Sequence, residues 1–214
     1  MAMIKSALEL ALERTKDLEV DEAALEARNL RQEGKKAAGR YLEDPAANEL
    51  GAALSPFPKD KRKLVREGMF ETLAAQLQLP TNELALESFQ ALAKGFLALA
   101  AAPAGNGLLG GVGGAVAEKR ATALLQQLEG FLKQYLDDMK NVEQAIRKQW
   151  APKLREKERQ LAQRMGQDVR LDPMTDPEFA AFYKQNVSAV RQQYIDALEK
   201  AKVDLASYLG IEGK

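Results

Sequence analysis

The feature that most constrains this chain is a run of apolar residues between residues 115 and 150 whose spacing alternates between three and four. The run consists of Leu125, Leu128, Leu132, Tyr135, Met139, Val142 and Ile146. This spacing places the side chains along one seam of an α-helix. A straight helix over residues 115–150 would be about 54 Å long at 1.5 Å per residue. No small core covers such a length, so we expect a second long helix beside it.

A second seam lies near the carboxyl end of the chain. Asp176, Pro177 and Glu178 are typical of a helix start, because they supply a capping acid, a proline at the first helical position and an acid that the helix dipole favours. We expect this helix to run to about Leu209 and to end at Gly210. Its apolar stripe comprises Phe179, Tyr183, Val187, Val190, Tyr194, Ala197, Ala201, Leu205 and Tyr208. The two seams predict an antiparallel helical hairpin, and pairing of a seam with its copy in another subunit satisfies the same pattern.

Two features interrupt the helical pattern. Pro152 would cost about 3 kcal/mol in a helix interior, so we expect the first long helix to end or kink there and to resume with Leu154. Residues 103–114 are rich in glycine. Each glycine costs roughly 1 kcal/mol in a helix relative to alanine, so we expect a connection in this segment rather than a helix.

The N-terminal region carries further helical patterns. We expect helices over residues 3–17, 21–42, 45–54, 59–79 and 83–102. The last of these is apolar nearly all round, so we expect it to be the most buried helix in the chain. Glycine follows glutamate inside three of the predicted helices, at Gly34, Gly68 and Gly130, and these positions favour close helix crossings.

Composition excludes several kinds of chemistry. The chain of 214 residues contains no cysteine and no histidine. It therefore lacks thiol nucleophiles, disulfides, Ser-His-Asp catalysis and the most common ligands of transition metals. We predict no catalytic residue, no metal site and no cofactor. The chain carries 31 basic and 31 acidic residues, so no global field attracts it to nucleic acid or anionic lipid.

Two basic clusters are candidate interaction sites. Lys59, Lys61, Arg62, Lys63 and Arg66 stand at the start of a predicted helix, where the dipole prefers acids, so another contact must favour positive charge there. The second cluster lies in the segment 147–164, and its candidate residues are Arg147, Lys148, Trp150, Lys153, Arg155 and Arg159. These side chains could contact phosphates, with the indole stacked on a base. A solvated helix face with ion pairs between neighbouring turns explains the same residues and is the interpretation we favour.

The uncharged stretch over residues 95–117 invites two further hypotheses. Its length suits a membrane-spanning helix, but Pro103, Asn106 and the glycines weaken both its hydrophobicity and its helicity, so we predict no transmembrane segment. The glycines also lack the Lys-Ser/Thr sequence of a phosphate-binding loop. We interpret residues 105–114 as a connection, and docking of this apolar loop on a membrane or on a partner protein is the alternative.

These patterns together predict an all-α protein, a helical bundle with a long antiparallel coiled-coil-like C-terminal hairpin. Its regions are a helical part over residues 1–102, the glycine-rich connection 103–114 and the hairpin 115–214, and the first and last of these can form one domain.

The N-terminus carries charges through any candidate signal peptide, so we expect a cytoplasmic protein. The leading hypothesis is a non-enzymatic scaffold that binds a protein partner or associates with itself. The alternative is nucleic-acid binding through residues 147–164.

Overall fold

The computed structural model describes residues 22–101 and 112–211, and within these ranges the chain forms only helices and turns. The all-α prediction is confirmed. The elements are α2 (Glu22–Glu43), α3 (Leu50–Ala53), α4 (Arg62–Gln76), α5 (Leu84–Ala101), α6 (Val112–Met165), the 3-10 helix η1 (Pro173–Thr175) and α7 (Pro177–Tyr208). The helix expected over residues 3–17 lies outside the described residues.

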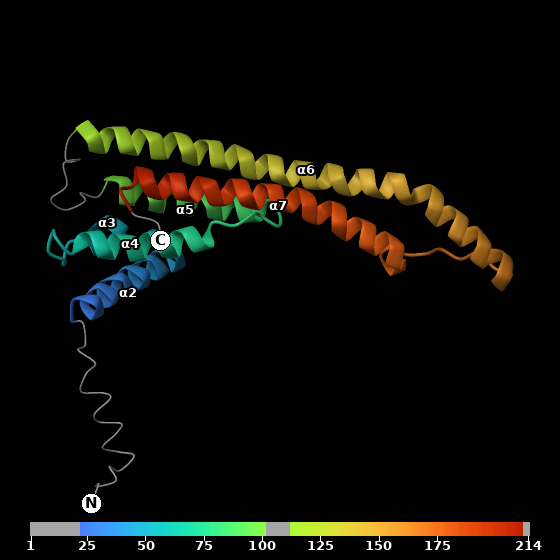
Figure 1. Cartoon of the computed structure of the whole chain (residues 1–214), viewed down its shortest axis with the longest axis horizontal. Coiled ribbons are helices and arrows are strands. Elements are labelled where there is room, and N and C mark those ends of the chain that lie inside the picture. Colours follow the sequence, from blue (N-terminus) through green and yellow to red (C-terminus); the bar gives the residue numbers. More distant parts are fainter. Residues whose placement is uncertain (1–21, 102–111, 212–214) are drawn as a thin grey trace, which may run out of the picture.

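The molecule consists of a helical head and a long projection. Figure 1 shows α6 and α7 side by side and antiparallel along the longest axis, with α2, α3, α4 and α5 gathered under one end of this pair. We call that end the head. One hydrophobic core there joins residues of α2, α4 and α5 to the first half of α6 and the last half of α7.

The seam that defines the hairpin is buried as predicted. Its buried members are Leu125, Leu128, Leu132, Tyr135 and Ile146. Met139 and Val142 between them are half-buried. On α7 the predicted stripe is wrong at one position, because Ala197 is exposed and Leu198 is buried instead. The apolar face of a straight helix drifts away from an exact seven-residue repeat, and the larger residue occupies the core.

Two glycines bring α2 and α4 into backbone contact. A Cβ atom built on Gly34 would lie 2.0 Å from the carbonyl oxygen of Val65, and one built on Gly68 would lie 2.0 Å from the carbonyl oxygen of Arg31. The predicted close crossing is therefore confirmed at these two positions. It is wrong at Gly130, where a Cβ atom would meet nothing within 4 Å.

The two helices run parallel, and ion pairs flank their crossing. Lys61 at the start of α4 pairs with Glu26 near the start of α2. Lys35 pairs with Glu71 further along both helices at 2.8 Å.

The prediction that the helix over residues 83–102 is the most buried is wrong. Five of the 18 residues of α5 are buried, against seven of the 15 residues of α4. Much of the apolar character of α5 comes from half-exposed alanines, and Leu84 at its start is 71% exposed. By length and composition α5 is the one helix among the described residues that could cross a membrane. Its buried residues Phe89, Leu92, Phe96 and Leu99 belong to the core of the head.

The long helix α6 extends beyond both of its predicted limits. It begins at Val112, inside the segment that we expected to be non-helical, and residues 102–111 lie outside the described residues. It also continues through Pro152 to Met165 instead of ending there. Pro152 is exposed, so the backbone carbonyl that loses its hydrogen bond lies on the solvent side of the helix. Figure 1 shows α6 curving over this distal part, which agrees with a proline bend.

Candidate functional site

The candidate site is the part of the hairpin that projects beyond the head, which we call the arm and define as residues 138–194. Figure 1 shows α6, α7 and the turn between them continuing beyond the other helices, and the segment before α5 reaches only the start of the arm, where Glu83 pairs with Lys140 at 2.9 Å. A second, smaller hydrophobic cluster holds the arm together. Its buried members are Ile146, Trp150 and Phe179, and its half-buried members are Val142, Leu154, Phe182, Tyr183 and Val187. Two helices with a core of this kind form a slender structure that cannot enclose a large cavity.

Trp150 belongs to this core. Its indole is 7% exposed and packs at 5.4 Å from the ring of Phe182 and at 5.8 Å from the ring of Phe179, measured between centroids. The ammonium group of Lys153 lies 4.4 Å from the indole centroid, close enough for a cation–π interaction. The indole Nε1 has no hydrogen-bond partner among the described residues. The structure therefore places the ring between the two helices, where it is not available to stack on a base.

Two tyrosine–carboxylate hydrogen bonds cross the arm between its helices. The hydroxyl of Tyr194 donates to Asp138 at 2.5 Å, and the hydroxyl of Tyr183 donates to Glu143 at 2.7 Å. Burial, followed by the bond to Asp138, raises the pKa of Tyr194 to about 12. The bond to Glu143, followed by burial, raises the pKa of Tyr183. Both pairs fix the position of α7 along α6, because a shifted register would leave the carboxylates and hydroxyls unpaired.

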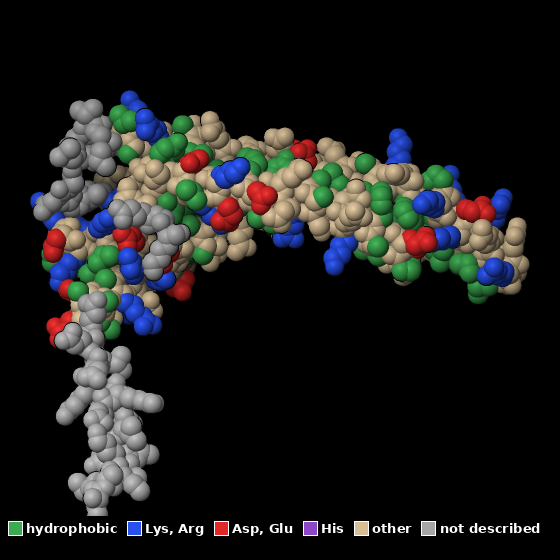
Figure 2. Space-filling view, viewed as in Figure 1, with side chains coloured by type: hydrophobic (Ala, Val, Ile, Leu, Met, Phe, Trp, Pro, Cys, Tyr) green, Lys and Arg blue, Asp and Glu red, His purple; other side chains and the backbone are tan. Residues whose placement is uncertain are grey.

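The predicted basic residues of the arm lie on different faces of α6. Lys148, Arg155 and Arg159 share its outward face, at positions i, i+7 and i+11. Arg159 pairs with Glu156 at 3.1 Å. Arg147, Lys148 and Arg155 are exposed and make no ion pair within the described residues. Figure 2 shows that blue side chains outnumber red ones over the distal half of the arm.

Lys157 ties the two helices together near the turn. Its ammonium group contacts Asp176 at 2.7 Å and Glu178 at 2.9 Å. The hydrogen bonds to these two carboxylates raise the pKa of Lys157, and the bond from Lys157 lowers the pKa of Asp176. Asp176 also accepts a hydrogen bond from the backbone N–H of Glu178 and so caps α7, as the sequence predicted.

The first basic cluster has a structural role. Arg66 is 3% exposed, and its guanidinium group donates to the carbonyl oxygens of Leu99 at 2.8 Å and Leu209 at 3.1 Å. These carbonyls belong to the carboxyl ends of α5 and α7, where a positive charge is favourable. Burial lowers the pKa of Arg66. Arg62 donates in the same way to the carbonyl oxygen of Phe57 at 2.9 Å. Arg66 therefore joins the ends of α5 and α7 within the head, and Arg62 binds the segment just before α4.

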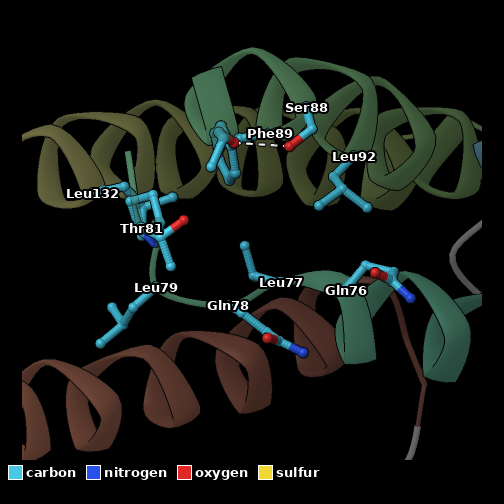
Figure 3. A pocket seen from close by; sticks show the side chains of 11 residues that line it. Gln76, Leu77, Gln78, Leu79, Thr81, Ser88, Phe89, Leu92 and Leu132 are labelled. Carbon is cyan, nitrogen blue, oxygen red and sulfur yellow. Dashed lines mark hydrogen bonds between the residues drawn. The ribbon is translucent and has the colours of Figure 1, made fainter. Parts of the chain in front are cut away.

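A small pocket lies where the arm leaves the head. Its volume is about 220 Å³, and Figure 3 shows Leu77 and Leu92 facing it from opposite sides. The lining residues are Gln76, Leu77, Gln78, Leu79, Pro80, Thr81, Ala85, Ser88, Phe89, Leu92 and Leu132. None of these side chains is titratable, so this pocket offers no group for acid–base catalysis. In the described ranges, moreover, no three acidic side chains gather into a group that could hold a metal ion.

The sequence patterns did not point to the pocket or to the tyrosine–carboxylate bonds. A signal for the bonds was present in the stripe of α7, because a half-buried tyrosine needs a partner for its hydroxyl. Asp138 and Glu143 border the seam of α6 and are the acids that supply this partner.

Comparison with known proteins gives a family but no function. Residues 51–207 match the model of a family of unknown function (DUF6657), and the chain belongs to this family. No curated protein and no solved structure matches the chain. The matched range begins within α3 and ends one residue before the end of α7, so it contains the entire arm.

Proposed function

We propose that this protein is a non-enzymatic helical scaffold that presents its arm to a protein partner. The observation that carries the proposal is the separation of the molecule into a head with a large core and an arm with a core of its own. The arm adds little to the core of the head, and its length therefore calls for another explanation. A rigid helix pair that projects into solvent offers long outward faces for recognition by another protein.

The inner contacts of the arm support this role. The aromatic cluster around Trp150 and the hydrogen bonds of Tyr183 and Tyr194 hold the two helices at one register. A pre-ordered surface loses less conformational entropy when it binds than a flexible one does. The outward faces of the arm are therefore suited to binding without prior folding.

Site-specific photocrosslinking of the full chain tests the proposal. A photoreactive amino acid would replace Gln163 or Gln185, which are exposed on the arm, and in control variants Gln32 or Gln90, which are exposed on the head. We expect one defined protein from native extract to crosslink at the arm positions, and excess unlabelled protein to compete with it. Equal crosslinking at head and arm positions, or crosslinks that resist competition, would contradict the proposal.

Self-association is a separate prediction. The seam residues of α6 pack within a single chain, so the hairpin needs no second copy to bury them. Size-exclusion chromatography with light scattering tests for self-association, and a strict monomer at high protein concentration would contradict it.

A further inference from the structure

We propose that one side of the arm binds an acidic helix of a protein partner. This inference rests on the proposed function and names the surface and the chemistry of the partner. The surface is a set of four basic residues that we call the basic ladder: Lys140 and Arg147 on α6, and Lys184 and Arg191 on α7. The two cations of each helix are seven residues apart, close to two full turns, so they lie on one face of that helix.

The cations of the two helices lie on the same side of the hairpin. Arg147 follows the buried Ile146, and Lys184 follows Tyr183, whose hydroxyl bonds to Glu143 of α6. One step along a helix turns the side chain by about 100° away from the interface. Both helices are right-handed and run in opposite directions, so the two steps lead to the same side of the pair. In agreement, the bond to Glu143 and burial raise the pKa of Tyr183, and the nearby charge of Arg147 acts against this rise.

The register of the arm brings these cations into two rungs. Ring contacts of 5.4 Å between Trp150 and Phe182, and of 5.0 Å between Tyr135 and Tyr194, fix the level of α7 along α6. Between these contacts the cations of the two helices meet at two similar levels. The rungs are Arg147 with Lys184 and Lys140 with Arg191. They lie about 10 Å apart along the arm. Like charges at one level repel each other, so an acid placed between them is favoured by both.

The middle of the arm contains no acid that balances the ladder. Residues 144–155 and 179–195 include six basic residues and no acidic one. The six are Arg147, Lys148, Lys153, Arg155, Lys184 and Arg191. Those of the ladder are exposed and make no ion pair with another described residue. Glu143, the acid of α6 nearest in sequence to Arg147, accepts the hydrogen bond of Tyr183. This side of the arm is therefore complementary in charge to an acidic partner.

One rung already binds a carboxylate from another segment of the chain. Glu83, which lies just before α5, pairs with Lys140 at 2.9 Å. The hydrogen bond from Lys140 lowers the pKa of Glu83, and the bond to Glu83 raises the pKa of Lys140. An acid therefore reaches the ladder from the side of the head. The other three cations continue along the arm without such a partner.

A helix is the partner shape that fits the ladder. Glutamates seven residues apart on a partner helix match rungs that are seven residues apart on α6 and α7, as in the charged pairs that flank coiled-coil seams. Nucleic acid fits this surface less well. The indole of Trp150 is 7% exposed and cannot stack on a base, and a chain with a formal net charge of zero exerts little long-range attraction on a polyanion.

Binding of a synthetic peptide to the full chain tests the inference. The probe is a fluorescein-labelled, alanine-rich helix of about 21 residues in which a pair of glutamates recurs every seventh residue, followed by fluorescence anisotropy at low ionic strength. We expect saturable binding that falls by at least about threefold in the triple variant Arg147→Gln, Lys184→Gln, Arg191→Gln, because three exposed pairs are lost.

A matched control variant removes the same charge from other surfaces. Lys148→Gln and Arg155→Gln alter the outward face of α6, and Arg28→Gln alters the head, all at exposed positions. This triple control should change the binding by less than about twofold. Glu83→Gln should tighten the binding by up to about fivefold, because Lys140 is then free to pair with the peptide. An equal loss of binding in the two triple variants would overturn the inference.

Further probes decide between partners. A peptide of the same composition with all its glutamates in one block should bind at least about threefold more weakly, because it reaches only one rung. Absence of peptide binding would overturn the inference, as would tighter binding of single-stranded DNA of about 20 nucleotides or of phosphatidylserine vesicles. Crosslinking of a defined partner at Gln163 without peptide binding would refute this inference and leave the proposed scaffold function intact. Peptide binding with equal crosslinking at head and arm positions would contradict the proposed function and leave the ladder as an acid-binding surface.

Discussion

Replacement of Gly34 by alanine should destabilise the protein, whereas the same replacement at Gly39 in the same helix should stabilise it. Both glycines lie in the interior of α2, where alanine is favoured over glycine by about 1 kcal/mol. The two positions differ in what surrounds the added methyl group. At Gly39 the new Cβ atom meets nothing within 4 Å, and at Gly34 it would lie 2.0 Å from the carbonyl oxygen of Val65 and 3.0 Å from the backbone nitrogen of Met69.

The magnitude at Gly34 follows from the contact with backbone atoms. The carbonyl of Val65 belongs to a helix and cannot rotate away, so α2 and α4 must separate by more than 1 Å. Overpacking of this kind typically costs 1–3 kcal/mol, and a backbone clash belongs at or above the upper limit. Subtraction of the helix gain leaves a net loss of about 2 kcal/mol or more for Gly34→Ala, against a gain of about 1 kcal/mol for Gly39→Ala.

Urea unfolding and thermal unfolding, both followed by circular dichroism at 222 nm, measure the free energy of unfolding and the melting temperature of both variants. For a chain of this size we expect the melting temperature to fall by about 4–8 °C in Gly34→Ala and to rise by about 2–4 °C in Gly39→Ala. Gly68→Ala should resemble Gly34→Ala, because its Cβ atom meets the carbonyl oxygen of Arg31. A Gly34→Ala protein as stable as the unmodified chain would refute the backbone contact between α2 and α4.

Three other perturbations test separate contacts. Because the pKa of Tyr194 is raised to about 12, its stabilising effect is complete below pH 10 and disappears as the pH rises from about 10 to 12. Screening by solvent reduces this effect to about 1 kcal/mol, so Tyr194→Phe should lose about 1 kcal/mol less stability over that range than the unmodified chain in urea unfolding, whereas Tyr208→Phe should lose as much as the unmodified chain. Arg66→Met removes hydrogen bonds from a charged donor to the ends of α5 and α7, so we expect it to lower the free energy of unfolding by about 2–3 kcal/mol in urea, against almost no change for exposed Arg28→Met. The pKa of Asp176 is lowered, so its contribution is present above its ordinary pKa near 3.8 and is lost as the pH falls through the lowered value. The protection factors of the amides in the first turn of α7, which are the exchange rates corrected for the intrinsic pH dependence of exchange, should therefore fall at acidic pH, and unchanged protection would contradict the importance of the Lys157–Asp176 pair.

The long-range outline of the fold was predictable because it depends on periodic residues. The seams of α6 and α7, the cap at Asp176 and the end at Gly210 all use local signals, and the structure has the predicted hairpin with α7 between these two limits. Gly210 has a φ of 66°, and the backbone N–H of Ile211 donates to Ala206, which together close the last turn of α7.

The remaining features depend on neighbours that the sequence does not identify. The role of Arg66 requires the ends of α5 and α7 to meet beside α4, and α7 follows Arg66 by more than one hundred residues. The degree of burial of α5 could not be deduced from its composition. Alanine and leucine both count as apolar in a sequence pattern, but in the structure many alanines of α5 are half-exposed while leucines such as Leu92 and Leu99 are buried. The arm itself was predicted as part of the hairpin, but its extent beyond the head depends on where α2, α4 and α5 end in space.

The position of the one tryptophan in the sequence has a practical consequence. Trp150 lies in the cluster of the arm, far from the crossing of α2 and α4. Its fluorescence emission therefore acts as a built-in reporter of local melting at that site, while far-ultraviolet ellipticity averages over the entire molecule. Thermal curves recorded by the two signals on one sample reveal whether both cores unfold as a single cooperative unit or in sequence.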